Sequence, residues 1–453
     1  MEKKQAVSKK NKNISEKKVL NKKIKIVRIF SRLNIGGPSI HTILLTAGLN
    51  NDSFTSILVK GLEDKDEGNM LYLAESKSIE PIIIPEMGRS ISILKDLKAF
   101  IKLYKLIKKE KPNIVHTHTA KAGALGRTAA ILIRNQGRSS RTLKKLLFHK
   151  NLQHESQNSK LKIVHTFHGN IFKGYFNPII SKIFLLIERV LARFTDIIIT
   201  VSKEQKKEIL NFGIGDKDKV ITIPLGLELE RFLDLKRFKG RLRAELKIAE
   251  DIKLIGIIGR LVPIKNHKMF IDAVSKLKER NSELKVKFLI IGDGELKKEL
   301  MNYVGEKELE EDVIFLGFRK DMEIIYADLD IVVLTSLNEG LPVALIEAMA
   351  SGKAVISTKV GGVIDLFEKT DDIEYEEKDA EKDYEVINCG ILIKSGDREG
   401  LSLAIKELIE NDSLRERMGE EGKKIVYPKY DISRLIDDMK SLYEGIVYKK
   451  VQV

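Results

Sequence analysis

Short apolar runs alternate with amphipathic segments along almost the whole chain, and this alternation constrains the fold more than any other feature of the sequence. The apolar runs are bounded by Gly, Pro or Asp, which is typical of strands buried on both faces. The clearest amphipathic segment is 91–111, where apolar residues recur at nearly 3.6-residue spacing between lysines. Strands that alternate with helices predict a parallel sheet with helices on both faces. The strands predicted in the first half are 24–30, 57–60, 81–85, 113–118, 162–169 and 196–202.

A second series of the same kind follows a turn near residue 226. We therefore predict an α/β protein with two doubly wound, Rossmann-like domains at 24–225 and 226–430. We expect 431–453 to form a helix that packs back on the first domain, and 1–23 to be a basic arm outside the fold. The strands predicted in the second half are 252–260, 285–294, 312–318, 330–336, 353–358 and 390–393.

The sequence contains no predicted membrane span or secretion signal. Its longest apolar stretches, such as 183–187 and 197–201, are far shorter than the roughly 18 residues that a transmembrane helix needs. No apolar core follows the N-terminal lysines, and Cys389 is the only cysteine, so neither export nor a disulfide framework is expected. We therefore expect a cytoplasmic location.

The formal net charge of +15 is concentrated in two segments. Residues 1–25 hold ten Lys against two Glu, and residues 134–162 hold eight Lys or Arg against one Glu. Residues 368–385 are acidic, with ten Asp or Glu against three Lys. Such runs of like charge with few apolar residues are usually solvated, so we predict a basic insertion at 134–162 and an acidic insertion at 368–385.

The basic charge permits two interpretations. A nucleic-acid-binding protein would need aromatic side chains among its cations, but 1–25 has no aromatic residue and 134–162 has only Phe148. An anionic membrane surface fits better, because the arm, the basic insertion and 91–111 all lie in the first half of the chain. For 91–111 itself, a helix packed on the core with solvated lysines and a helix that faces lipid headgroups both remain possible.

The most specific segment of the chain is 336–352, SLNEGLPVALIEAMASG. Pro suits the first turn of a helix and Gly suits the position after its end, so we predict a helix over about 342–350. The free amides and the dipole at its N-terminus would receive a phosphate, and Glu347 could accept hydrogen bonds from sugar hydroxyls. The alternative is that Glu339 only favours the helix dipole and Glu347 is a surface residue.

Other predicted strand ends carry polar groups toward the same region. Strand 252–260 ends at Arg260, and Lys265 follows; such cations neutralise a departing diphosphate. A Gly-Gly-Pro-Ser turn at 36–39 lets the backbone approach a ligand closely. Each group could instead be structural or merely exposed. The histidines at strand ends are His116, His118 and His168.

Together these motifs resemble glycosyltransferase family 4, the retaining transferases of the GT-B fold. The likeness covers about 24–445 and includes GGPS, HTFHG, VSKE, GRLVPIKNH, GDG, GF and Glu-x7-Glu in the right order. RLNIGGPSIH and HTHTAKAG look typical of bacterial enzymes that build surface polysaccharide or lipopolysaccharide. The resemblance implies two Rossmann-like domains that face each other across a cleft, with the acceptor on the first and the nucleotide-sugar on the second. The basic arm and both charged insertions depart from the family but interrupt no motif.

The resemblance also implies roles for matching residues. Arg260 and Lys265 correspond to the diphosphate-binding pair, Glu339 and His168 lie beside the donor sugar, and these four are the expected catalytic residues. Glu347 is implied on the ribose. The other implied donor-binding residues are Gly36, Gly37, Gly259, Gly317, Phe318, Arg319, Gly340, Leu341, Pro342 and Val343. The residues expected on the acceptor side are His116, His118 and Lys121.

The implied reaction moves a sugar from a nucleotide-diphosphate sugar, with UDP favoured, to a hydroxyl of a lipid-linked or saccharide acceptor, with retention. The donor is a substrate, so no cofactor is expected. We also expect no metal, because the cationic pair serves the diphosphate and the Asp-x-Asp sequences at 64–66, 216–218 and 328–330 do not end strands. Expected partners are the donor, the acceptor and the inner face of an anionic membrane, but no nucleic acid. A nucleotide-sugar epimerase of the same fold is the alternative, which the complete Glu-x7-Glu segment disfavours.

Overall fold

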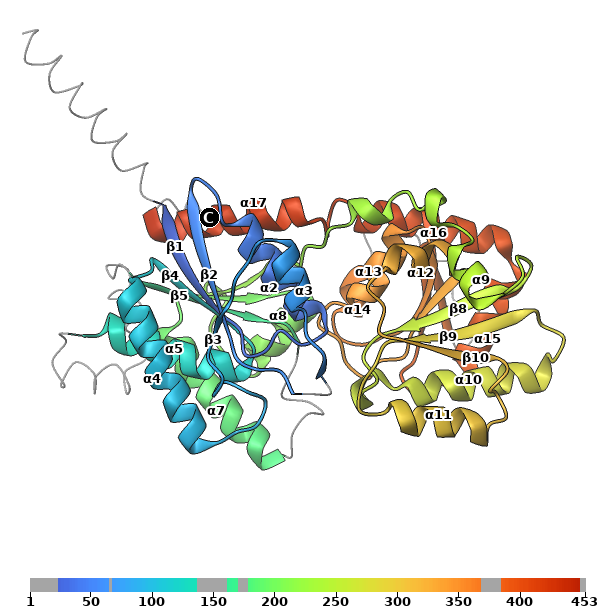
Figure 1. Ribbon diagram of the computed structural model, residues 1–453, viewed down its shortest axis with the longest axis horizontal. Coiled ribbons are helices and arrows are strands. Elements are labelled where there is room, and N and C mark those ends of the chain that lie inside the picture. The colour runs from blue at the N-terminus through green and yellow to red at the C-terminus, as the bar shows by residue number, and fades with distance from the viewer. Residues whose placement is uncertain (1–22, 65–66, 137–160, 170–177, 368–383, 449–453) are drawn as a thin grey trace, which may run out of the picture.

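The computed structural model describes residues 23–64, 67–136, 161–169, 178–367 and 384–448 of the chain. These residues form two β-sheets that lie next to each other, each with helices on both faces (Figure 1). The α/β prediction is therefore confirmed.

The first sheet has seven parallel strands in the order β3-β2-β1-β4-β5-β6-β7. Its strands are β1 (Ile24–Ile29), β2 (Phe54–Lys60), β3 (Ile82–Ile83), β4 (Ile114–His118), β5 (Lys162–Phe167), β6 (Ile197–Thr200) and β7 (Val220–Thr222). Its helices are α2 (Gly37–Gly48), α3 (Leu71–Ser76), α4 (Ile93–Glu110), α5 (Ala120–Arg134), α7 (Pro178–Phe194) and α8 (Lys203–Asn211).

The second sheet has the order β10-β9-β8-β11-β12-β14-β13, and β13 is antiparallel to β14. Its strands are β8 (Lys253–Ile258), β9 (Val286–Ile291), β10 (Val313–Gly317), β11 (Ile331–Leu334), β12 (Ala354–Thr358), β13 (Tyr384–Ile387) and β14 (Gly390–Ile393). Its α-helices are α9 (Arg241–Leu246), α10 (His267–Arg280), α11 (Lys297–Glu306), α12 (Met322–Asp328), α13 (Val343–Ala350), α14 (Val363–Leu366), α15 (Arg398–Glu410) and α16 (Asp412–Val426).

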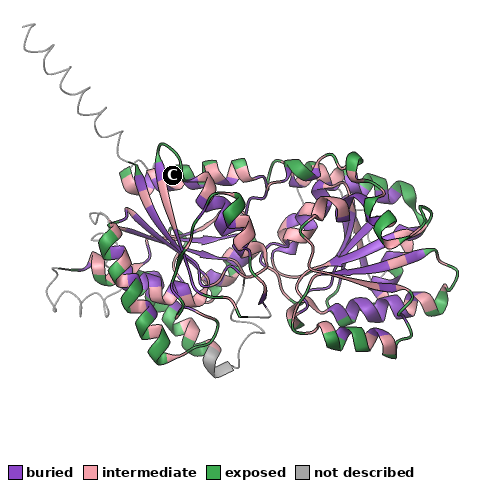
Figure 2. Cartoon of the chain, in the orientation of Figure 1, coloured by how far each residue is buried: buried purple, intermediate pink, exposed green. Residues whose placement is uncertain are grey.

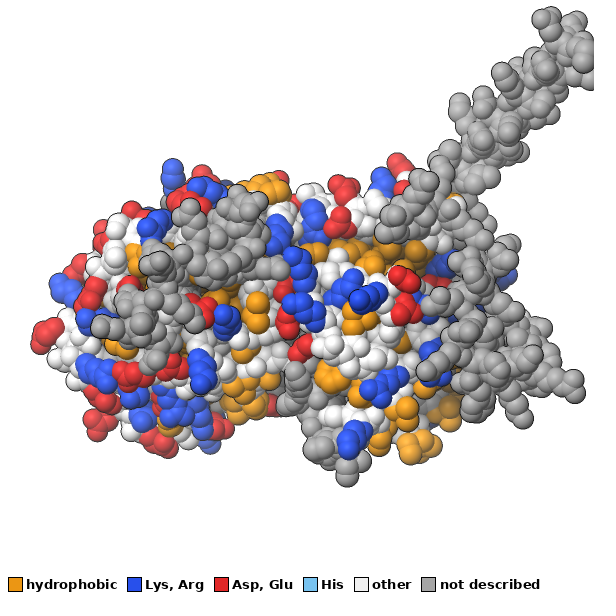
Figure 3. All heavy atoms as spheres, turned by 180° about the vertical axis from the view of Figure 1, so that it is seen from behind, with side chains coloured by type: hydrophobic (Ala, Val, Ile, Leu, Met, Phe, Trp, Pro, Cys, Tyr) orange, Lys and Arg blue, Asp and Glu red, His pale blue; other side chains and the backbone are white. Residues whose placement is uncertain are grey.

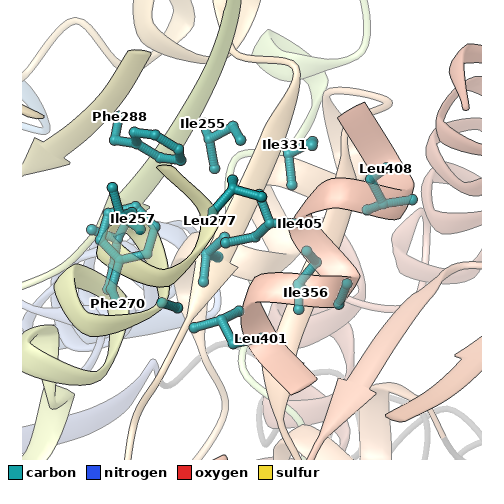
Figure 4. Packing of buried hydrophobic residues seen from close by; sticks show 14 of the residues in the cluster. Ile255, Ile257, Phe270, Leu277, Phe288, Ile331, Ile356, Leu401, Ile405 and Leu408 are labelled. Carbon is teal, nitrogen blue, oxygen red and sulfur yellow. The ribbon is translucent and has the colours of Figure 1, made fainter. Parts of the chain in front are cut away.

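Hydrophobic burial on both faces of each sheet explains why the strands read as continuous apolar runs. In the second sheet, Ile255 and Phe288 pack with residues of α10 and α15 on one face (Figure 4). Leu254 and Val332 pack with α12 and α13 on the other face, because neighbouring strand residues point in opposite directions. Most strands are buried along most of their length, apart from the edge strand β3, whose two residues are exposed, and many exposed residues lie on the outer helices (Figure 2).

The last helix, α17 (Ile432–Tyr448), leaves the second half of the chain and packs against α2 of the first (Figure 1). Its Tyr443 joins a buried apolar cluster with Ile26 and Leu45. The Tyr443 hydroxyl lies 2.6 Å from His116 Nδ1 and accepts a hydrogen bond from Arg28 Nη1 at 3.1 Å. One end of the chain therefore completes the core built by the other.

Both charged insertions are shorter than predicted, because residues at their ends belong to the fold. Arg134 ends α5 and pairs with Asp196 at 2.8 Å, and Lys162 begins β5 and is buried, so both belong to the fold. Tyr384 and Glu385 are the first residues of β13. The rest of both insertions, 137–160 and 368–383, and the arm 1–22 lie outside the described residues.

Helix α4, which lies within 91–111, packs on the core with one part of its surface and exposes apolar residues on another. Ala99, Leu103 and Ile107 are buried against the core. A second set of large apolar residues is exposed on α4 and on α7, two helices that both pack against α5. We call this set the α4–α7 apolar face; its members, with exposed fractions, are Ile93 (85%), Leu94 (74%), Leu97 (54%), Ile101 (42%), Ile183 (54%) and Leu186 (61%).

Leu94, Leu97 and Ile101, which recur at helical spacing within 91–111, therefore do not face the core, whereas Ile107 does. Figure 3 shows hydrophobic side chains interspersed with Lys and Arg along the lower edge of the half that carries the first sheet. In the described part of the chain, no helix is long and apolar enough to cross a membrane.

Candidate active site

A cavity of about 360 Å³ lies between the two sheets, at the carboxyl ends of their strands. This edge is where open α/β sheets bind ligands. Elements of both halves contribute walls, so the site exists only when the two halves meet. The predicted residues that line it are Gly36, Gly37, His168, Gly259, Arg260, Lys265, Phe318, Arg319, Glu339, Gly340, Leu341, Pro342, Val343 and Glu347.

Two glycines allow the halves to approach each other at this cavity. A Cβ on Gly37, at the start of α2, would lie 2.7 Å from Cγ2 of Val343. A Cβ on Gly340 would lie 2.0 Å from the carbonyl oxygen of His168. Both contacts join the first half of the chain to the second, so these glycines serve the closure of the cleft as well as the exposure of backbone amides.

Lys265 and Glu339 form the charged centre of the cavity. Lys265 lies in a 3-10 turn after β8, and Glu339 lies between β11 and α13. Lys265 Nζ donates to Glu339 Oε1 at 2.5 Å, and Ser336 Oγ donates to the same oxygen at 2.6 Å. Thr335 Oγ1 donates to the Lys265 carbonyl at 2.9 Å, which fixes the turn. The ammonium group is thus held at the cavity wall by a carboxylate that is only 10% exposed.

Arg260 supplies a second cation at the end of β8. When the side-chain amide of Asn34 is oriented so that its oxygen and its nitrogen both have hydrogen-bond partners, the oxygen accepts from Arg260 Nη1 at 3.0 Å. Asn34 belongs to the loop between β1 and α2, so this contact also spans the cleft.

Helix α13 begins at Val343, one residue later than predicted, and Pro342 is its N-cap. Gly352 follows the helix with a φ of +68°, a backbone conformation that favours glycine. Glu347 lies on this helix and lines the cavity. Burial raises its pKa to about 7, against the opposing effects of Arg231 and of a hydrogen bond from Tyr326 at 3.2 Å. Because burying a carboxylate costs free energy unless it accepts hydrogen bonds, Glu347 is suited to accept them from the hydroxyl groups of a ligand.

Only part of the donor-binding segment expected at 317–319 lines the cavity. Phe318 and Arg319 line the cavity, but Gly317 does not: it has a φ of +67° and its carbonyl accepts from the Gly292 amide at 2.8 Å. The Arg319 guanidinium is bonded to Asp321 at 2.6 Å and to Glu245 at 2.5 Å. These two carboxylates of the protein therefore neutralise the charge of the Arg319 guanidinium.

Three residues predicted on the acceptor side do not line the cavity. His116 is fully buried and is bonded to Tyr443, Arg28 and Thr166, so α17 covers it. Lys121 Nζ is bonded to Asp96 at 2.6 Å and to the Ser90 carbonyl at 2.6 Å. His118 is also fully buried. His116 and His118 are therefore too deeply buried to contact an acceptor, which corrects that prediction, whereas the acceptor-side role of Lys121 stays a prediction.

His168 is the histidine that reaches the cavity, and two others pack around it. His118 Nδ1 lies 2.9 Å from His168 Nε2. The ring of His41, on α2, packs edge-on against His168 with centroids 5.0 Å apart. One ligating atom from each of the three lies within 4.8 Å of the others, so the cluster has the composition of a possible metal site.

Two residues that no sequence motif indicates also shape the cavity. Arg231 lines it and lies 3.5 Å from Glu323, and Tyr326 binds Glu347. Neither lies in a recognisable motif, because each acts through tertiary contacts. The Asp-x-Asp at 328–330 is structural, since both carboxylates bind backbone amides, those of Gly240 and Leu254.

Two family profiles match this chain: "Glycosyl transferases group 1" over residues 238–425 and "Glycosyl transferase 4-like domain" over 83–226. The chain is 29% identical over 375 residues to an Escherichia coli UDP-Gal:alpha-D-GlcNAc-diphosphoundecaprenol alpha-1,3-galactosyltransferase, which covers 82% of this chain and 86% of that protein. It is 26% identical to the capsular polysaccharide biosynthesis glycosyltransferase CapM of Staphylococcus aureus, over 80% of this chain and 84% of CapM.

Solved structures show the same fold. Anabaena Alr3699/HepE in complex with UDP-glucose superposes with a TM-score of 0.72 at 20% identity, over 93% of this chain and 100% of that one. Sucrose-phosphate synthase of Thermosynechococcus elongatus superposes with a TM-score of 0.72 at 17% identity, over 94% and 100%. Both halves of the chain and their relative arrangement are thus shared with these proteins.

Proposed function

The chain belongs to glycosyltransferase family 4 and has the GT-B fold, and on that premise we propose that it transfers a sugar from a UDP-sugar to a diphospholipid-linked saccharide. The product would be an intermediate of a cell-surface polysaccharide. The Escherichia coli relative, whose name gives UDP-Gal as donor and a diphosphoundecaprenol-linked sugar as acceptor, supports this choice.

The convergence of Arg260, Lys265, Glu339 and Glu347 on one cavity is the observation that carries the proposal. A nucleotide-diphosphate sugar needs cations at its diphosphate, a hydrogen-bond acceptor at its ribose and polar groups at its sugar. The cavity brings these groups together: the two cations follow β8, Glu339 and the helix that carries Glu347 follow β11, and His168 follows β5. We assign the diphosphate to Arg260 and Lys265, the ribose to Glu347, and the sugar to Glu339 and His168.

We further propose that the anomeric configuration is retained. The sugar acquires positive charge and the diphosphate negative charge as their bond breaks. Glu339 already binds Lys265 and Ser336, so it is better suited to orient groups than to attack the sugar as a glycosidase nucleophile does. A leaving phosphate oxygen that takes the proton of the acceptor hydroxyl on the same face requires no protein nucleophile, and Lys265 and Arg260 would stabilise it.

We propose that this chemistry needs no metal. Two nitrogen ligands of a tetrahedral zinc ion, bound at 2.0–2.1 Å, lie roughly 3.3 Å apart and direct both lone pairs at the metal. His118 Nδ1 and His168 Nε2 lie 2.9 Å apart in rings inclined by only 23°. That is the arrangement of a hydrogen bond between two imidazoles, so we interpret His118 and His168 as a hydrogen-bonded pair against which His41 packs.

We expect a labelled lipid product when the protein is incubated with a lipid extract and labelled UDP-sugars, and little with GDP- or dTDP-sugars. EDTA should leave the turnover unchanged, and NMR of the product should show the anomeric configuration of the donor. Chromatography of the sugar nucleotide detects the alternative. A new nucleotide-sugar formed without any acceptor would indicate an epimerase and overturn the proposal.

We also propose that the enzyme works at the cytoplasmic face of an anionic membrane, with the α4–α7 apolar face toward the lipid. That face combines exposed Ile and Leu side chains with six lysines on α4 against two acidic residues. Apolar residues enter the headgroup region, and each nearby cation adds about 1 kcal/mol on anionic lipid. The face lies on the first half of the chain, to which we assign the lipid-linked acceptor.

The double variant Leu94→Glu, Leu97→Glu should sediment with anionic phosphatidylglycerol vesicles at least ~10-fold less than the wild type, since burying one leucine contributes about 1.5–3 kcal/mol. Met301→Glu is the matched control, because Met301 is 50% exposed on α11 of the other half. If the wild type bound anionic and neutral vesicles equally well, the proposed contribution of the lysines would be contradicted. If Met301→Glu lost as much vesicle binding as the double variant, the α4–α7 apolar face would be excluded as the membrane-binding surface.

A further inference from the structure

The histidine that lines the cavity has a second histidine behind it, and this pair carries an inference about how the donor sugar is held. We propose that His118 is a positioning residue that keeps the proton of His168 on Nδ1, so that His168 presents a hydrogen-bond donor to the sugar. The inference rests on the proposed role of His168 beside the sugar, but the state of the ring can be measured without turnover.

The two histidines are brought together by neighbouring parallel strands. His118 is the last residue of β4, and β5 pairs with β4 so that His118 lies opposite Thr166. His168 follows two residues later, just beyond the end of β5. His118 Nδ1 and His168 Nε2 are 2.9 Å apart, with ring centroids 5.2 Å apart and planes inclined by 23°. The rings are therefore nearly coplanar, and their nitrogens face each other edge to edge.

The lowered pKa values indicate that both rings are neutral near pH 7. Burial lowers the pKa of His168 to about 3. Burial, the neighbouring histidines and Arg28 hold the pKa of His118 well below its usual value. A contact between two neutral imidazoles must be an N–H···N hydrogen bond, in which one ring donates and the other accepts.

The surroundings of His118 decide which ring donates. His118 Nε2 is buried and has no hydrogen-bond partner among the described residues. If His118 accepted at Nδ1, its proton would sit on Nε2 as an orphaned buried donor, and orphaned buried N–H groups are rarer than acceptors without a partner. His118 therefore donates through Nδ1.

The consequence lies on His168. Its Nε2 accepts from His118, so its single proton is on Nδ1. His168 lines the cavity, and Nδ1 is the nitrogen that remains for the ligand. The edge-on contact of His41 with His168, at 5.0 Å between centroids and 72° between planes, restrains the ring from turning. The site then offers a fixed donor toward an oxygen of the sugar.

The test compares His118→Asn with His118→Ala by ¹⁵N NMR of the histidine rings and by kinetics. The amide nitrogen of Asn takes about the place of Nδ1 and keeps a donor, whereas Ala removes it. We expect the Nδ1–H form of His168 in the wild type and in His118→Asn, with kcat within about 3-fold of each other. In His118→Ala we expect loss of the Nδ1–H form and a ~10–100-fold lower kcat, as for a lost buried hydrogen bond, with little change in UDP affinity.

Two results would overturn the inference: a His168 that carries its proton on Nε2 in the wild type, or equal loss of kcat in His118→Asn and His118→Ala. Unfolding temperatures of the variants, measured alongside, identify a variant that fails to fold. If no sugar transfer is found at all, the NMR comparison still decides the state of His168, so failure of the proposed function and failure of this inference are distinguishable.

Discussion

Replacing Lys265 by Ala should lower kcat by about 10²–10³-fold while the Kd of UDP rises by less than about 10-fold. The ammonium group is held at the cavity wall by Glu339, and its charge matters most when the diphosphate departs. An interaction that strengthens in the transition state lowers kcat when it is removed, and a missing electrostatic donor typically costs this much. Single-turnover kinetics together with calorimetry of UDP binding separate the two effects.

Two controls make this prediction specific to the leaving group. Lys285 pairs with Asp251 on the surface, so Lys285→Ala should leave kcat unchanged; equal loss in both variants would contradict the assignment. Lys265 could also matter only because it neutralises the poorly exposed Glu339. In that case the double variant Lys265→Ala, Glu339→Gln would recover turnover, whereas we expect it to stay as low as Lys265→Ala or lower.

Glu347→Gln should weaken UDP binding by about 10–100-fold at pH 8.5, because hydrogen bonds to a charged acceptor contribute about 1.5–3 kcal/mol. Wild-type binding should also weaken as the pH falls through about 7, where Glu347 takes up a proton. The variant lacks this titration. The UDP affinities of wild type and variant are measured by calorimetry from pH 6 to 8.5 and compared as a ratio, because the titration of the diphosphate itself cancels in that ratio. A ratio that does not change with pH would contradict the role of Glu347.

The same substitution should stabilise the ligand-free protein. The pKa of Glu347 is about 7 in the folded chain against 4.5 for the free side chain, so the folded state binds this proton more tightly. The free energy of unfolding therefore falls as the pH rises from about 4.5 to about 7, by at most about 3 kcal/mol, and the cost persists above pH 7. Urea unfolding at pH 8.5 should find Glu347→Gln more stable, and equal stability of both proteins would contradict a buried charge.

Much of the site could be predicted because its residues follow strand ends. Arg260, Glu339 and His168 each lie within a few residues of the end of a parallel strand, and parallel strands bring their carboxyl ends to one edge. Gly37 and Gly340 were predicted for their backbone amides, but the structure adds that each faces the other half of the chain. The local sequence pattern predicts where these residues lie along the chain, and the fold determines which residues they contact.

Contacts that are distant in sequence decide the surroundings of several predicted residues. His116 and His118 are two residues apart on β4 and so point to the same face, yet Tyr443 covers His116, from 327 residues away. Arg319 is bonded to Glu245, 74 residues away. Leu94, Leu97 and Ile101 recur at helical spacing on α4 and are exposed, whereas Leu103 and Ile107 of the same helix are buried. For His116 and Arg319, a partner distant in sequence decides what the side chain contacts.

The sequence by itself determined the two α/β halves, the order of the strands along the chain and the charged residues at their ends, because strand periodicity, glycine turns and helix caps are local properties. Only the tertiary structure decided which of these groups reach the cavity, that His168 is backed by His118, that Glu347 is buried enough to raise its pKa, and that the α4–α7 apolar face is exposed. Burial and hydrogen-bond pairing depend on segments that meet only when the two halves and α17 have packed together.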